Sequence, residues 1–271
     1  MKRRIDTLLA ERGLAASRTS AAQSVRAGRV RIGHDGPVAT KPGQLVAEEA
    51  ELLLSEPPPF VSRGGIKLSN ALEALGIEVA GLSCLDVGAS TGGFTDCLLE
   101  RGAERVIALD VAHGQLDWGL RNDPRVEVVE RANARDLRPA DLPFAPELAA
   151  IDVSFISLAK VLPAVAACLA PDGRLLGLVK PQFELDRERV GKGGVVRSPA
   201  DRRNALRSVA AVAEATGLAV LGFASSGLPG PKGNRETFIH CARQPATNLA
   251  ASGRETEEAA GVDSAITEVE P

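Results

Sequence analysis

A glycine-rich turn between a predicted strand and a predicted helix is the first place where this sequence could bind a ligand. The turn runs from Asp86 to Thr95 with the sequence DVGASTGGFT, and the helix expected after it carries Leu98 and Leu99. Glycine has no side chain, so the backbone of such a turn can approach a ligand closely, although a purely structural tight turn is the alternative. The candidate cofactor-binding residues of the turn are Asp86, Gly88, Ser90, Gly92, Gly93 and Phe94.

The residues around this turn indicate which cofactor it would bind. The GxGxxG spacing of dinucleotide sites is absent, and so is the GK[ST] ending of nucleoside triphosphate loops. One strand later Asp110 ends the apolar run VIALD, where a carboxylate can accept hydrogen bonds from both hydroxyls of a ribose. Asn133 and Ala134 follow the next strand and are candidates for a contact with adenine, although Asn is also a common turn residue. Together these features favour an adenosine-containing cofactor.

Apolar runs that alternate with helical stretches predict a parallel sheet from Leu82 onward. The runs are SCLDVGAS, RVIALDV, VEVVERAN, ELAAIDVSF and RLLGLVKPQF. Continuous Val, Ile, Leu and Ala are typical of strands that are buried on both faces and covered by helices. Two later runs, LAVLGFASS and ETFIHCAR, flank the Gly- and Pro-rich GLPGPKGN and predict an antiparallel hairpin at the sheet edge. The expected fold class is therefore α/β, with a doubly wound Rossmann-like sheet.

Charged residues at the ends of these strands could form a reaction centre. Asp152 and Lys180 each end a predicted strand. The carboxyl ends of parallel strands form one crevice, so these two residues should share a rim with Asp86 and Asp110. Pro181 should bend the chain away from the strand and leave the lysine at the edge. A plain ion pair between Asp152 and Lys180 is the structural alternative.

A basic segment precedes this predicted sheet. Residues 1–43 hold nine lysines and arginines against three acidic residues, although the whole chain has a net charge of −3. Ser17 is expected to cap a helix that ends at Gly28, and Val30 and Ile32 then alternate with arginines as in a strand. A positive face of this kind can bind phosphates, and a merely solvated basic face is the alternative. The basic residues that could contact the phosphates of a nucleic acid such as RNA are Arg3, Arg4, Arg12, Arg18, Arg26, Arg29, Arg31 and Lys41.

Proline-rich and acidic segments predict how the chain is divided. Three consecutive prolines, Pro57 to Pro59, interrupt both helix and sheet and mark a domain boundary. From Pro245 onward the chain holds six acidic residues and Arg254, with too few apolar side chains to offset the entropy of ordering. We expect a small α+β domain over residues 1–58, a catalytic domain over residues 59–244 and a disordered acidic tail over residues 245–271.

Several classes of protein are disfavoured by composition. Cys84, Cys97, Cys168 and Cys241 lack CxxC spacing, which predicts buried reduced thiols rather than a disulfide framework or a structural zinc site, and we expect no metal. No run of eighteen or more apolar residues occurs, and the first residues lack an apolar secretory core. We therefore expect a cytoplasmic protein with no membrane partner.

Ordered strings along the chain resemble two known families. The segment RIDTLLAERGLAASRTSAAQSVRAGRVRIG, followed by KPG at residues 41–43, resembles the small RNA-binding module called the S-four domain, over about residues 3–55. Nearly the whole chain, to about Arg243, resembles the TlyA-type 2′-O ribosomal RNA methyltransferases, whose catalytic domain is similar to that of FtsJ. The resemblance rests on SRGGIKL from Ser62, LDVGASTGGFTDCLL from Leu85, IDVSFISL from Ile151, LVKPQFE from Leu178, VGKGGVV from Val190 and GPKGNRETF from Gly230.

This resemblance implies an activity and a set of residues. It implies methyl transfer from S-adenosylmethionine to cytidine 2′-oxygens of ribosomal RNA, with assembled ribosomal subunits as partners. The implied catalytic tetrad is Lys67, Asp152, Lys180 and Glu236, although Glu236 seen alone could be a surface residue beside Arg235. A class I methyltransferase sheet with a small N-terminal S-four-type α+β domain is the implied architecture.

The chemistry explains why two amines and two carboxylates belong together. A sulfonium methyl is already electrophilic, so the enzyme must align it with the attacking oxygen and remove the hydroxyl proton. We expect Lys180 to accept that proton, because a neighbouring lysine and partial burial both favour its neutral form. Asp152 should orient the resulting ammonium, while Lys67 and Glu236 hold the ribose oxygen and balance charge.

Other interpretations remain at this stage. The segment from Asp186 to Arg197 is basic and glycine-rich, and it could clamp phosphates or be an ordinary loop. An RNA-binding protein of the ribosome with an inactive methyltransferase fold is the second functional hypothesis, against which the intact tetrad argues. A haemolysin, a name attached to some members of the resembled family, ranks last because the sequence has no apolar span.

Overall fold

The computed structural model describes residues 1–243 and 255–270 of the chain, and for residues 255–260 it describes the backbone alone. Two compact units divide between Pro58 and Pro59, within the three consecutive prolines. Each unit has its own apolar core.

The N-terminal unit is a small α+β structure. Its elements are β1 (Lys2–Arg4), α1 (Ile5–Glu11), α2 (Arg18–Arg26), β2 (Val30–Ile32), β3 (Leu45–Ala47) and β4 (Leu52–Leu54). Strand β1 pairs with β3 and β2 pairs with β4, both antiparallel. The Ser17 side chain accepts a hydrogen bond from the backbone N–H of Ser20 at 3.1 Å, which confirms the predicted helix cap. Strand β1 was not predicted, because three residues carry too short a pattern.

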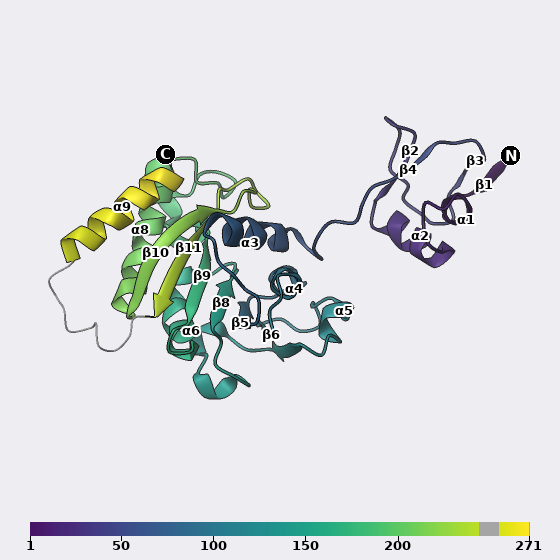
Figure 1. The fold of residues 1–271 in the computed structure, drawn as a ribbon. Coiled ribbons are helices and arrows are strands. Elements are labelled where there is room, and N and C mark those ends of the chain that lie inside the picture. Colours follow the sequence, from purple (N-terminus) through teal and green to yellow (C-terminus); the bar gives the residue numbers. More distant parts are fainter. Residues whose placement is uncertain (244–254, 271) are drawn as a thin grey trace. The chain divides into compact units, whose positions relative to one another are not determined.

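The second unit is built around a seven-stranded sheet in the order β10-β11-β9-β8-β5-β6-β7 (Figure 1). The strands are β5 (Ser83–Val87), β6 (Arg105–Asp110), β7 (Val126–Glu130), β8 (Leu148–Ile151), β9 (Arg174–Val179), β10 (Leu218–Ser225) and β11 (Thr237–Arg243). Strands β5 to β9 pair parallel, whereas β11 is antiparallel to both β9 and β10. The predicted parallel sheet and its closing antiparallel hairpin are thus confirmed.

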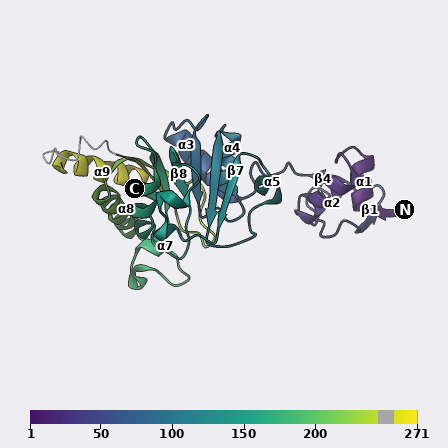
Figure 2. The ribbon, with the colours of Figure 1, turned by 90° about the horizontal axis from the view of Figure 1, so that it is seen from below.

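Helices cover both faces of this sheet (Figure 2). They are α3 (Arg63–Ala74), α4 (Gly93–Glu100), α5 (Trp118–Arg121), α6 (Leu162–Cys168), α7 (Pro181–Glu184), α8 (Pro199–Ala215) and α9 (Glu255–Val269), with short 3-10 turns at Ala134–Asp136, Pro139–Asp141, Leu158–Lys160 and Arg187–Arg189. Alternate residues of one strand enter different cores: Leu85 packs with residues of α6 and α8, whereas Cys84 packs with residues of α3 and α4. This alternation is the doubly wound arrangement that the buried apolar runs predicted.

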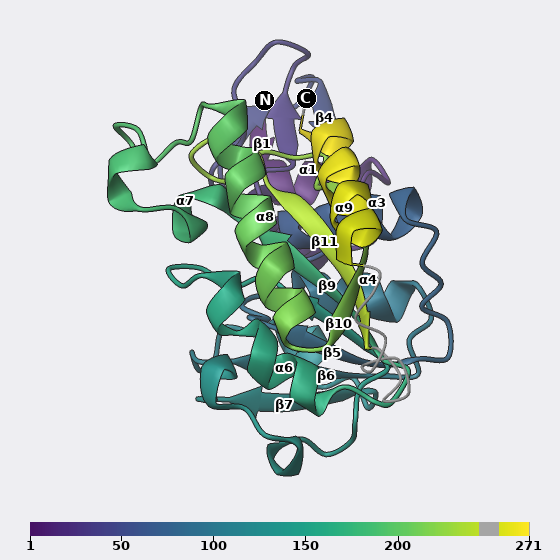
Figure 3. The same ribbon diagram turned by 90° about the vertical axis from the view of Figure 1, so that its left-hand side faces the viewer.

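The structure corrects the interpretation of residues 245–271 as a disordered acidic tail. Residues 255–269 form helix α9, which lies beside α8 and β10 (Figure 3), while residues 244–254 lie outside the described residues. Ile266 is fully buried, and Val262 and Val269 are half-buried against the same core. The average composition of the segment does not indicate this helix, because only these three side chains, spaced by four and three residues, form its apolar face.

Two further observations bear on the excluded classes. All four cysteines are free and buried, as predicted, and burial raises the pKa of each thiol. Across residues 1–243 and 255–270, no helix has the length and apolar character needed to cross a membrane.

Candidate active site

The carboxyl ends of four parallel strands bring the predicted reaction centre to one edge of the sheet. Asp86 lies within β5, Asp110 ends β6, and Asp152 and Lys180 follow β8 and β9 directly. Backbone hydrogen bonds hold this edge together, because Gly88 N–H donates to the Leu109 carbonyl at 2.8 Å. The rim that the strand pattern predicted is therefore present.

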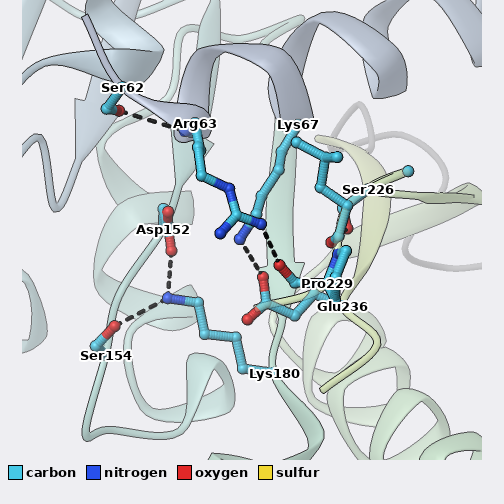
Figure 4. A network of polar contacts seen from close by, with 12 residues as sticks. Ser62, Arg63, Lys67, Asp152, Ser154, Lys180, Ser226, Pro229 and Glu236 are labelled. Atoms are coloured by element: carbon cyan, nitrogen blue, oxygen red, sulfur yellow. Dashed lines mark hydrogen bonds and ion pairs between the residues drawn. The ribbon is translucent and has the colours of Figure 1, made fainter. Parts of the chain in front are cut away.

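Two ion pairs form the centre of the site (Figure 4). Lys67 Nζ on α3 contacts Glu236 Oε2 at 2.5 Å, and Lys180 Nζ contacts Asp152 Oδ1. Both lysines are buried, with exposed fractions of 7 % and 8 %, and Glu236 is 2 % exposed. The structure thus brings together all four residues of the implied tetrad. Lys180 also donates a hydrogen bond to the Ser154 hydroxyl at 2.9 Å, a contact that the sequence did not indicate.

Three cavities meet at this centre and share Gly88, Ser90 and Asp152. The glycine-turn cavity, about 320 Å³, is also lined by Arg63, Gly64, Asp86, Gly93 and Phe94. The Asp110 cavity, about 440 Å³, is also lined by Asp110, Gln115, Asn133 and Ala134. The lysine cavity, about 470 Å³, is also lined by Lys67, Lys180, Glu236, Phe155 and Lys232. One ligand could therefore occupy the first two cavities and present an atom to a second ligand in the third.

Asp86 offers a buried carboxylate oxygen without a protein partner. Its Oδ2 accepts hydrogen bonds from the Thr95 N–H at 2.9 Å and the Thr95 hydroxyl at 2.7 Å, which fixes the start of α4. Its Oδ1 has no hydrogen-bond partner among the described residues, although the side chain is fully buried and lines the glycine-turn cavity. Burial raises the pKa of Asp86 to about 7, and the two Thr95 hydrogen bonds oppose this rise. An unpartnered buried acceptor points to a ligand donor or cation there.

Two glycines of the turn leave no room for a side chain. A Cβ on Gly88, whose φ is +87°, would lie 2.4 Å from the Asp152 carbonyl oxygen. A Cβ on Gly93 would lie 2.0 Å from the Ser62 hydroxyl. Gly92 differs from the prediction in its placement: it does not line any of the three cavities, and its φ of +98° turns the chain into α4. Phe94 lines the glycine-turn cavity and packs against Phe238.

The other predicted cofactor residues line the Asp110 cavity. The Asp110 carboxylate accepts a hydrogen bond from the Ser90 N–H and another from the Ala112 N–H, each at 2.7 Å. Each oxygen keeps a second lone pair for a ligand hydroxyl. The Asn133 side chain accepts a hydrogen bond from the Arg135 N–H at 3.2 Å, so it also has the turn-forming role that is common for Asn after a strand.

Sequence reasoning missed two residues that shape the lysine cavity. Asn234 joins the segment from Asp186 to Arg197 to the GPKGN loop. Its side chain accepts a hydrogen bond from the Val196 N–H at 2.9 Å and donates one to the Gly194 carbonyl at 2.7 Å. Phe155 is 92 % exposed with a φ of +64°, and its ring lies 5.5 Å from that of Phe183. The sequence carries no local signal for either residue, since the exposure and the left-handed φ of Phe155 are visible only in the structure.

The predicted RNA-binding residues of the N-terminal unit fall into three groups. Several have their charges compensated within the unit: Arg3 contacts Glu11 and Glu48, and Arg4 and Arg18 contact the buried Asp6. The side chains of Arg12, Arg29 and Arg31 donate to backbone carbonyls. Arg26 and Lys41 are exposed, and no described residue forms an ion pair with either of them.

Family models match both units of the chain. Residues 60–243 match the FtsJ-like methyltransferase family, and residues 3–52 match the S4 domain. The first match covers the sheet, both ion pairs and all three cavities.

Individual relatives span nearly the whole chain. The 16S/23S rRNA (cytidine-2'-O)-methyltransferase TlyA of Mycobacterium tuberculosis is 49 % identical over 254 residues, which cover 93 % of this chain and 94 % of the relative. Hemolysin A of Brachyspira hyodysenteriae is 37 % identical over 88 % of this chain and 98 % of the relative. A solved structure from Streptococcus thermophilus, described as a candidate hemolysin, is 38 % identical with a TM-score of 0.71 and covers 99 % of this chain and 95 % of its own.

Proposed function

The chain belongs to the FtsJ-like methyltransferase family, and we propose that it methylates the 2′-oxygen of a cytidine in ribosomal RNA with S-adenosylmethionine as donor. The observation that carries this proposal is the pairing of Lys67 with Glu236 and of Lys180 with Asp152 in one cavity. That cavity shares Gly88 and Asp152 with the glycine-turn cavity, so a methyl donor and a ribose can meet there.

The residues around the glycine turn fit the donor. When bound, S-adenosylmethionine supplies an electrophilic methyl group on a positively charged sulfur. Asp86 provides the unpartnered buried oxygen, and Gly88 provides the close backbone approach that the amino acid part of the donor requires. Asp110 and Asn133 line the Asp110 cavity and would hold the adenosine of the donor.

Lys180 is the group that would accept the hydroxyl proton of the ribose. Its Nζ is held between Asp152 and the Ser154 hydroxyl, so the lone pair of the neutral amine has a fixed position at the cavity wall. Asp152 would stabilise the ammonium that forms when the ribose proton arrives. A base within hydrogen-bond reach of the hydroxyl typically contributes about 10² to 10⁴ in rate.

Lys67 and Glu236 would orient the ribose. The pair is nearly inaccessible to solvent, and it borders two cavities: Lys67 lines both the glycine-turn and the lysine cavity, and Glu236 lines the lysine cavity. Glu236 can accept a hydrogen bond from the 2′-hydroxyl of an adjacent nucleotide. Lys67 would donate to the reacting 2′-oxygen and stabilise its developing negative charge.

The Asp86 carboxyl predicts how cofactor affinity changes with pH. Because its pKa is raised to about 7, the side chain is neutral in acidic buffer and ionised in alkaline buffer. A bound cation favours the ionised form, so affinity for S-adenosylmethionine should rise as the pH increases through about 7 and should level off above it. Isothermal titration calorimetry across this range measures the rise.

Asp86→Asn is the matched variant, because it keeps the shape of the side chain and removes its charge. Its affinity should be weaker in alkaline buffer and flat across the same range, and a rise as steep as in the wild type would show that another group titrates. Without ligand, the raised pKa should make the free energy of unfolding fall between pH 3.8 and about 7, because the unfolded chain releases this proton first. The variant should lack that fall.

Arg26 and Lys41 predict the salt dependence of RNA binding. Their charges are not compensated by any described ion pair, so replacing both with Gln should weaken RNA binding about tenfold at low salt. The slope of log affinity against log salt should fall by about two, since about one counterion is released per phosphate contact. Filter binding at several salt concentrations measures both. Arg3→Gln should lose less, because Glu11 and Glu48 already compensate that charge, and an equal loss would contradict the assignment.

Methylation assays test the proposed function directly. Purified protein is incubated with labelled S-adenosylmethionine and either intact ribosomal subunits or deproteinised ribosomal RNA. Label should enter the intact subunits, and the modified nucleotide should resist alkaline cleavage, because a 2′-O-methyl group blocks that reaction. An RNA with a 2′-deoxycytidine at the mapped position should take up no label. RNA binding without label in any substrate would contradict the proposal and favour the inactive-fold hypothesis.

A further inference from the structure

We propose that helix α9 positions the reaction centre through the buried carboxylate of Glu270, and so acts as a C-terminal latch on the catalytic strands. The latch is defined here as α9 with Glu270 and its partner Arg202. The inference rests on the proposed function, since the centre that it positions is the Lys180 and Glu236 end of the tetrad.

Glu270 is fixed by three contacts inside the protein. It is 3 % exposed, and its Oε2 accepts a hydrogen bond at 2.7 Å from Arg202 Nε on α8, which is itself 7 % exposed. Its Oε1 accepts from the Thr237 hydroxyl at 3.2 Å, and its backbone carbonyl accepts from Arg203 Nη1 at 2.9 Å. A buried charge pair of this kind has a defined geometry, because a displaced partner would leave the other charge uncompensated.

The partners of Glu270 adjoin the catalytic residues. Thr237 follows Glu236 directly and pairs in the sheet with Val179, the residue before Lys180. Val179, Pro181, Arg202, Thr237 and Glu270 line one small space behind the strand ends. The Glu270 carboxylate therefore contacts the sheet at the paired residues Thr237 and Val179. Each of these is the chain neighbour of a proposed catalytic residue, Glu236 or Lys180.

The Arg202–Glu270 pair also anchors the segment from Asp186 to Arg197, called the basic segment below, which lines the lysine cavity. Arg202 Nη1 donates to the carbonyl of Arg197, the last residue of that segment, at 2.9 Å. Near its other end, Arg189 contacts Asp201 at the start of α8 at 3.7 Å. Movement of Arg202 would release Arg197 and change the wall that Val190 and Gly194 contribute to the lysine cavity.

Helix α9 has two separate kinds of attachment. Its apolar face, with Ile266 fully buried, holds it against α8 and β10 (Figure 3). Its charged attachments differ in place: Arg207 contacts Asp263 at 2.6 Å on the exposed surface between α8 and α9, whereas Arg202 contacts Glu270 inside. The exposed pair joins the same two helices but does not reach the strands, so it provides a matched control.

The test compares Glu270→Gln with Asp263→Asn in the full-length protein. Glu270→Gln should lower kcat for RNA methylation about tenfold, with KM for S-adenosylmethionine within twofold of the wild type, since small displacements of catalytic groups cost rate. Trypsin should cleave the basic segment at Arg187, Arg189 and Lys192 faster than in the wild type. Asp263→Asn should leave kcat and the cleavage rate unchanged.

Thr237→Val provides a second variant if Glu270→Gln does not fold. It removes only the hydroxyl that contacts Glu270, keeps the ion pair with Arg202 and suits a strand. It should lower kcat severalfold with a nearly unchanged melting temperature, a split that a purely structural role would not produce.

The outcomes separate the latch from the proposed function. Wild-type kcat in folded Glu270→Gln and Thr237→Val would overturn the latch while leaving the methyltransferase function intact. An equal loss of kcat in Asp263→Asn would also overturn it, because general loosening of α9 would then explain the effect. If the wild type methylates no RNA, the proposed function fails, and an unchanged cleavage rate in Glu270→Gln would overturn the latch independently.

Discussion

Lys180→Met should reduce methyl transfer by roughly 10³-fold or more while S-adenosylmethionine still binds. The substitution keeps the length of the side chain and removes the amine that Asp152 and Ser154 hold at the cavity wall. Asp152 loses its partner, but its side chain is 24 % exposed, so water can hydrate the carboxylate and the fold should persist. Single-turnover kinetics with ribosomal subunits measure the chemical step, and calorimetry measures cofactor binding.

Lys160→Met is the control for this prediction. Lys160 is an exposed lysine in the Leu158–Lys160 turn after β8, and it lines none of the three cavities. It should keep the wild-type rate. A single-turnover rate near the wild-type value in Lys180→Met would show that another group or water accepts the proton, and the base assignment would be wrong.

Gly88→Ala should abolish cofactor binding, with an affinity loss of about 100-fold or more. The added Cβ would lie 2.4 Å from the Asp152 carbonyl oxygen, and the φ of +87° is unfavourable for alanine. The atom that the added Cβ would meet belongs to the Asp152 backbone, which cannot rotate away as a side chain can. Either the glycine turn or the backbone at Asp152 must therefore move. All three cavities meet at these two residues, so the cofactor site and the Lys180 contact should be lost together. Calorimetry and a methylation assay on the same preparation measure both losses.

Gly217→Ala separates backbone strain from loss of the site. Gly217, after α8, has a similar φ of +80°, but a Cβ there would meet nothing within 4 Å. Both variants should be less stable by about 1 to 3 kcal/mol from the backbone conformation alone. Only Gly88→Ala should lose cofactor binding, and equal affinities in the two variants would contradict the assignment of the turn.

The sheet could be predicted because its strands are continuous apolar runs, and such runs have few alternatives in a chain of this length. Asp152 and Lys180 could be predicted for the same reason, since each ends a parallel strand. Lys67 and Glu236 could not be found by this rule. Lys67 lies on a helix before the first strand of the sheet, and Glu236 precedes the one antiparallel strand of β5 to β11. Only the family resemblance indicated them.

Contacts that depend on a single side chain were beyond the sequence. Asn234 belongs to a Gly- and Pro-rich stretch that predicts a turn, and nothing local indicates that its amide would hold a segment forty residues earlier. Glu270 is one of six acidic residues in a stretch whose composition predicts a solvated tail, and its burial follows from the register of α9 on α8. Averages over a segment hide such residues because one apolar face and one charge decide the outcome.

The ion pair between Lys67 and Glu236 joins positions 169 residues apart, from the first helix of the catalytic unit to the residue before β11. A nascent chain emerging from the ribosome therefore has no complete reaction centre until β11 has been synthesised and inserted between β9 and β10. Such distant contacts form late, after the local helices and strands. The role proposed for Glu236 therefore predicts that a chain ending before residue 236 is inactive, so that activity appears only after synthesis has passed that residue.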